Sequence, residues 1–154
     1  MKTLYESILD DEDVLTNNLK KDINNPFNIL MNLNEEDCRN RSIVLKILRD
    51  VEYLKQVDEN YLSLRIDIDE FSRNKAIRNY YLGYPVNPPD MRDVCPICRI
   101  RIFITDEGKE IEISNPKHYA SPWDQDKIKQ VFGSVSLITN WIKKVSKKYK
   151  IKVY

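Results

Sequence analysis

The chain has 154 residues and a net charge of +1, and it is 42% hydrophobic and 32% charged, which is typical of a single folded globular domain. This composition excludes a disordered protein. The presence of only three glycines excludes the glycine-rich phosphate-binding loop of many nucleotide-binding enzymes. No apolar run reaches the roughly 18 residues that a membrane-spanning helix needs, so we expect no membrane partner.

The N-terminal part of the chain differs in character from the rest. Leu4, Ile8 and Leu9 recur at helical spacing, and the acids that follow suit the first turn of a second short helix. Acidic residues come too soon after the initial methionine for a signal peptide, and an odd number of cysteines favours a reducing compartment. The sequence therefore predicts an acidic amphipathic arm over residues 1–31, a single α+β domain over residues 32–154, and a cytoplasmic location.

The first half of the predicted domain contains two helices and a strand. Asn34 is a good N-cap, and the apolar residues after it recur at helical spacing, which predicts a helix over about 35–56. Residues 61–69 alternate apolar and polar side chains, as in a strand with one buried face. We expect a short helix over 71–82, and the prolines of residues 84–96 predict an extended loop.

The second half contains the clearest turn of the chain. The Asp-Glu-Gly sequence at residues 106–108 joins two alternating segments into a β-hairpin. A Ser-Pro-Trp-Asp cap from residue 121 opens a helix whose apolar stripe continues to Val145, and residues 150–154 alternate as an edge strand. From about residue 60 the order is therefore βαββαβ, the split βαβ pattern of a ferredoxin-like α+β domain. The long helix and the short helical arm precede it.

The Cys-Pro-Ile-Cys sequence at residues 95–98 is the spacing most suggestive of specific chemistry, because two thiols three positions apart can share a metal ion or form a redox pair. A zinc site needs four ligands, and the thiols and imidazole available are Cys38, Cys95, Cys98 and His118. Three interpretations stay open: a zinc site, a redox pair, or buried small residues at a strand entrance, which we favour. We therefore predict no cofactor, with zinc as the exception to test.

The C-terminal end is strongly basic. Six lysines and no acid occur in the last twelve residues, and such a pattern can contact phosphates. Lysine is also favoured at helix C-termini and on edge strands, so the pattern has a structural explanation as well. As an alternative function, it predicts a nucleic-acid-binding accessory protein. The candidate contacts are Lys143, Lys144, Lys147, Lys148, Lys150 and Lys152.

Tyrosines beside the proline-rich segment indicate a protein-binding surface, since tyrosine is enriched in protein interfaces. No catalytic set can be assigned around the single histidine. We therefore predict a small non-enzymatic protein that acts by protein–protein contact, with no small-molecule ligand inferred. The predicted partner-binding residues are Leu4, Tyr5, Ile8, Leu9, Tyr80, Tyr81 and Tyr84.

The opening of the chain has one resemblance. Residues 4–15, LYESILDDEDVL, followed by Asn25, Pro26 and Phe27, resemble the start of uncharacterised proteins of gut bacteria and their tailed bacteriophages. The resemblance covers about residues 4–27 and brings no named functional family, activity or site residue. A segment reused at the start of different proteins implies a docking or recruitment arm. It also implies a phage-encoded protein or an assembly accessory.

Overall fold

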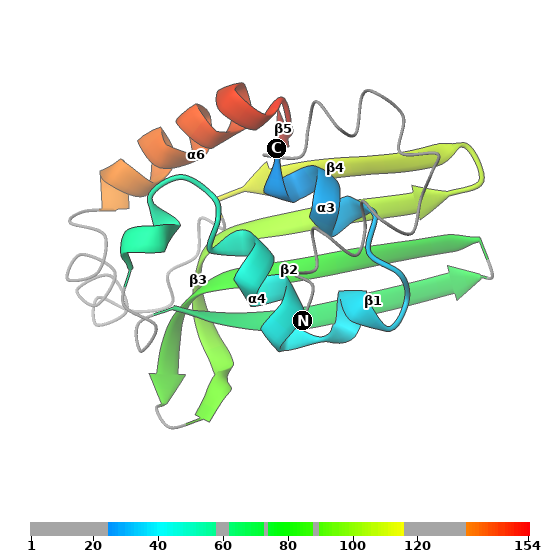
Figure 1. Ribbon diagram of the computed structural model, residues 1–154, viewed down its shortest axis with the longest axis horizontal. Helices are drawn as coiled ribbons and strands as arrows, with labels where there is room; N and C mark the ends of the chain where they lie inside the picture. The colour runs from blue at the N-terminus through cyan, green and yellow to red at the C-terminus, as the bar shows by residue number, and fades with distance from the viewer. Residues whose placement is uncertain (1–24, 58–61, 73, 88–89, 116–134) are drawn as a thin grey trace, which may run out of the picture.

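The computed structural model describes residues 25–57, 62–72, 74–87, 90–115 and 135–154. Over these residues the protein is α+β: helices come first, a sheet follows, and one further helix precedes the last strand (Figure 1). The helices are α3 Pro26–Met31, the 3₁₀ helix η1 Asp37–Arg39, α4 Arg41–Leu48, the 3₁₀ helix η2 Leu54–Gln56 and α6 Val135–Tyr149. The strands are β1 Ser63–Ser72, β2 Lys75–Asn87, β3 Asp90–Thr105, β4 Gly108–Ser114 and β5 Lys152–Val153.

The five strands lie in the sheet in chain order, β1-β2-β3-β4-β5. Strands β1 to β4 form an antiparallel meander, and β5 pairs in parallel with β4. This topology contradicts the ferredoxin-like βαββαβ prediction, because no helix separates β1 from β2. The helix predicted over 71–82 is wrong, since most of that segment is β2. Strand pairing on both sides, as at Leu82 with Leu64 and Cys98, outweighs the local helical preference.

The extended loop predicted over residues 84–96 is also wrong in part, because β2 continues to Asn87 and β3 begins at Asp90. Prolines are tolerated in strands where the ladder is irregular or one edge is free. Both conditions hold here: the β2–β3 register shifts after Leu82 and again after Pro85, and β4 pairs with β3 only from Arg99 onward.

Helices α3 and α4 begin at asparagine caps, and a third asparagine bonds the turn before η1. The Asn25 side chain accepts a hydrogen bond from Phe27 N, Asn34 accepts one from Asp37 N, and Asn40 accepts one from Ile43 N. The helix predicted over 35–56 is therefore present as three shorter pieces, η1, α4 and η2. Between α4 and η2, Tyr53 has a φ of 78°, a conformation that a helix cannot contain.

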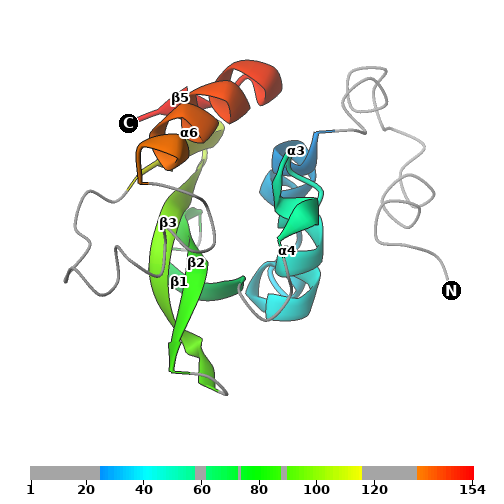
Figure 2. The same ribbon diagram turned by 90° about the vertical axis from the view of Figure 1, so that its left-hand side faces the viewer.

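Helices α3 and α4 lie together on one face of the sheet (Figure 2). Phe27 and Leu30 of α3 are buried in the same core as Val44 and Leu48 of α4. The predicted arm thus ends in a core helix, and a truncation that tests the arm must stop before Asn25. Residues 1–24 lie outside the described part of the chain.

Helix α6 is attached to the N-terminal layer by hydrogen bonds. Trp141 Nε1 donates to Glu52 O at 2.8 Å, and Glu52 N donates to the Tyr149 hydroxyl at 3.2 Å. Asn25 Nδ2 donates to Tyr149 O at 3.0 Å. The predicted start of this helix, near residue 121, lies outside the described residues. Among the described residues, no helix is long and apolar enough to cross a bilayer.

Candidate functional site

The predicted metal ligands are only partly described. Cys38 lies on η1, Cys95 and Cys98 lie on β3, and His118 falls outside the described residues. The three cysteines are buried and form no disulfide. Within the described ranges, no three histidine, cysteine or acidic side chains come together as a metal site would require.

The Cys-Pro-Ile-Cys sequence forms a β-bulge. Leu82 pairs with Cys98 and the next residue, Gly83, pairs with Pro96, so Ile97 is an extra residue in β3. A Cβ built on Gly83 would lie 2.0 Å from Cys95 O. The close approach of the two backbones therefore depends on glycine at this position, and the spacing of the cysteines has a structural explanation.

Burial makes the Cys98 and Cys38 thiols weaker acids than exposed cysteines. It raises the pKa of Cys98 from an ordinary value of 9.0 to about 12. It also raises the pKa of Cys38, although the charges of Arg78 and Arg39 oppose the shift. Both side chains are therefore neutral thiols at neutral pH, whereas a thiolate is the form that attacks disulfides or binds metals.

The Cys98 shift predicts a loss of stability at high pH. Between about pH 9 and 12 the unfolded thiol ionises while the folded one stays protonated, so the free energy of unfolding falls by about 1.4 kcal/mol per pH unit. The effect is absent below pH 9, where both states are protonated. Urea unfolding of wild type and Cys98→Ala at several pH values measures it. We expect the difference between the two to be constant below pH 9 and to shrink above it. A difference that stays constant to pH 11 would contradict the prediction.

The predicted tyrosine surface is largely interior. Tyr80 is 0% exposed and Tyr84 is buried, so neither is available to a partner in this structure, while Tyr81 is half-buried on the other face of the sheet. Strand alternation separates Tyr80 from Tyr81 in this way. The other four predicted contacts, Leu4, Tyr5, Ile8 and Leu9, lie outside the described residues.

The predicted nucleic-acid contacts, by contrast, are all exposed. Lys143, Lys144, Lys147 and Lys148 lie on α6, and Lys150 and Lys152 follow it. Lys148 Nζ is 3.0 Å from a Glu52 carboxylate oxygen, a contact that raises the pKa of that ammonium group. The structure thus presents a basic helix surface, but Tyr149, which lies among these lysines, is buried against Phe27.

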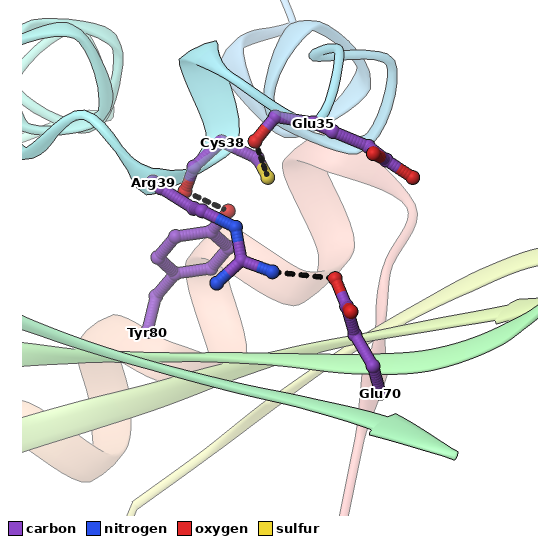
Figure 3. A network of polar contacts seen from close by, with 5 residues as sticks. All are labelled: Glu35, Cys38, Arg39, Glu70 and Tyr80. Carbon is purple, nitrogen blue, oxygen red and sulfur yellow. Dashed lines mark hydrogen bonds and ion pairs between the residues drawn. The ribbon is translucent and has the colours of Figure 1, made fainter. Parts of the chain in front are cut away.

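A polar cluster that the sequence did not indicate connects the helices to the sheet (Figure 3). Tyr80 rises from β2 and its hydroxyl donates to Cys38 O at 2.8 Å, while Cys38 Sγ donates to Glu35 O at 3.2 Å. Beside them, Arg39 forms an ion pair with Glu70 of β1.

This cluster borders a cavity of about 520 Å³ that we name the Arg78 pocket. Arg78 is an inward-facing residue of β2, paired across the ladders with Ile68 and Ile102. A correct strand assignment for β2 would have identified Arg78 as an inward-facing arginine, because it then lies on the same face as Tyr80 and Leu82. The pocket is lined by Asn32, Leu33, Asn34, Glu35, Cys38, Arg39, Ile68, Glu70, Ser72, Asn74, Lys75, Ala76, Arg78, Ile104 and Lys109.

The opposite face of the sheet carries arginines stacked on aromatic rings, also unforeseen. The Arg101 guanidinium carbon lies 4.2 Å from the Tyr154 ring centroid, that of Arg99 lies 5.0 Å from the same ring, and that of Arg65 lies 4.7 Å from Tyr81. We call this surface the Arg–aromatic face; it consists of Arg65, Tyr81, Arg99, Arg101, Phe103 and Tyr154.

Comparison of this chain with protein-family models, with curated proteins and with solved structures found no match.

Proposed function

We propose that this is a non-enzymatic accessory protein of the cytoplasm that binds a protein partner through the Arg–aromatic face. The observation that carries the proposal is a set of unsatisfied polar atoms on that face. The Nε atoms of Arg99 and Arg101 and the Oγ atom of Ser114 are buried and have no hydrogen-bond partner in the described part of the chain. Arg99 and Ser114 are direct neighbours across the β3–β4 ladder.

A buried donor without an acceptor costs about 1–3 kcal/mol, so groups of this kind need a reason to persist. A partner that presents carbonyl or carboxylate oxygens to the guanidinium groups of Arg99 and Arg101 would supply acceptors once these side chains turn toward it. Tyr154, a residue that is 43% exposed, would give the same partner an apolar surface. Arginine and tyrosine are also the residues that most often dominate the binding energy of protein interfaces.

The charges of this face favour a protein partner over a nucleic acid. Arg65 pairs with Asp67 at 2.9 Å, and Arg101 lies 3.6 Å from Glu112. These carboxylates offset the arginines and would repel phosphates, whereas a nucleic-acid surface is strongly and uniformly positive. The six lysines predicted to contact nucleic acid belong to α6 and the residues after it, so a nucleic-acid function would use a different set of residues.

Site-specific photo-cross-linking tests the proposal. A benzophenone amino acid is placed at Tyr154 and, as a control of matched exposure, at Tyr53, which is 39% exposed. We expect a specific cross-linked protein from Tyr154 alone. The double variant Arg99→Met and Arg101→Met keeps the apolar stems and should lower its yield about tenfold or more, with little change in melting temperature.

Two results would overturn this assignment. One is an equal yield from Tyr154 in the arginine variant. The other is salt-sensitive binding to single-stranded DNA or RNA that is lost when Lys143, Lys144 and Lys147 become glutamine. That second result would make the protein a nucleic-acid-binding accessory protein.

A further inference from the structure

The Arg78 pocket contains a buried cation that pairs with no carboxylate among the residues that the structure describes. Arg78 is 6% exposed, and within the described ranges the one hydrogen bond of its side chain runs from a guanidinium nitrogen to Leu33 O at 2.9 Å. Among the described residues it takes part in no ion pair. A guanidinium has five N–H donors, and burial of an unpaired charge is costly. One backbone carbonyl offsets part of that cost, and no guanidinium nitrogen of Arg78 is among the described buried polar atoms without a hydrogen-bond partner.

The other charged residues of the pocket do not neutralise the positive charge of Arg78. Arg39 and Glu70 pair with each other. Lys75 and Lys109, both exposed, line the same cavity and add two positive charges, against one further carboxylate at Glu35. The pocket therefore has an excess of positive charge around a buried guanidinium, which is an arrangement that binds anions.

We propose that the Arg78 pocket binds a small molecule that carries a phosphate group, with the phosphate held by Arg78, Lys75 and Lys109. Three cations suit a dianionic phosphate better than a single carboxylate charge. Neutral amides such as Asn34 line the remaining wall and can bond to the rest of the ligand. The cavity volume of about 520 Å³ is within the usual range of about 300–1,000 Å³ for small-molecule sites.

The pocket is a binding site and not a catalytic one. Its nucleophile, Cys38, is a neutral thiol that donates to Glu35 O, and burial raises its pKa. This inference does not depend on the proposed partner, because Arg78 and the Arg–aromatic face lie on opposite faces of the sheet.

The competing explanation is that Arg78 has a structural role, as the donor that holds Leu33 O in place. Substitution of exposed lysines of the pocket distinguishes this role from phosphate binding. Inorganic phosphate is titrated against the full chain at constant ionic strength, with the amide signals of Ala76, Arg78 and Cys38 followed by NMR. We expect saturable shifts at these amides. Lys75→Gln and Lys109→Gln should each raise the phosphate Kd about tenfold without loss of stability, and Lys143→Gln should leave it unchanged.

The same titration contains the results that would reject the site. These are an absence of saturable shifts with phosphate, equal shifts with acetate, or equal weakening by Lys143→Gln, which would indicate non-specific charge. An Arg78→Lys variant adds a check: if it folds, it should bind phosphate more weakly than wild type, because lysine lacks the planar fork of donors.

Discussion

Gly83→Ala should destabilise the protein by at least about 3 kcal/mol, or prevent it from folding, because the new methyl group would meet backbone atoms. A Cβ at this position would lie 2.0 Å from Cys95 O and 2.7 Å from Pro96 Cα. These atoms belong to the bulge in β3 and cannot turn away as a flexible side chain could. We expect a melting temperature about 10 °C lower in circular dichroism.

Gly108→Ala is the matched control, because it tests backbone conformation without crowding. Gly108 has a φ of 136°, and nothing lies within 4 Å of a Cβ placed there. Alanine at this hairpin turn should therefore cost about 1–2 kcal/mol through backbone strain alone. A Gly83→Ala protein as stable as wild type would show that β2 does not approach the bulge closely. The bulge would then no longer explain the spacing of Cys95 and Cys98.

Tyr80→Ala should cost about 3–5 kcal/mol, since it removes a fully buried aromatic ring between the sheet and the helices. Tyr80→Phe keeps the ring and removes only the hydroxyl that donates to Cys38 O, so it should cost about 1–3 kcal/mol. Urea unfolding of both variants and wild type, with slopes compared to confirm two-state behaviour, measures the two contributions separately.

The comparison of the two Tyr80 variants also tests its assignment as a core residue. A tyrosine on an exposed binding surface would tolerate both changes with losses below about 0.5 kcal/mol. Such a result would return Tyr80 to the predicted partner-binding surface. Equal, large losses in both variants would instead mean that the hydrogen bond to Cys38 O carries the whole effect, and that the ring adds little.

Several local features could be predicted from the sequence because they depend on neighbouring residues. The hairpin at residues 106–108 is present between β3 and β4, and the alternation of residues 61–69 corresponds to β1. Asn34 accepts a hydrogen bond from Asp37 N as a capping asparagine would, although the N-cap residue of η1 is Glu36, and the C-terminal segment forms the edge strand β5. In each case the turn, the cap or the alternation is formed by residues close together in the chain, and these residues strongly favour one local structure.

The secondary structure of the segment from residue 71 to residue 98 depends on tertiary contacts. Its apolar residues fit either a helix or a strand, and only pairing with β1 and β3 selects the strand. That choice places Tyr80 in the core, brings Arg78 into a pocket and turns the Cys-Pro-Ile-Cys sequence into a bulge opposite Gly83. The stacking of Arg99 and Arg101 on Tyr154 likewise joins β3 to the residue that follows β5. The pairing itself could not be read from the local sequence, because its energy comes from residues far apart in the chain.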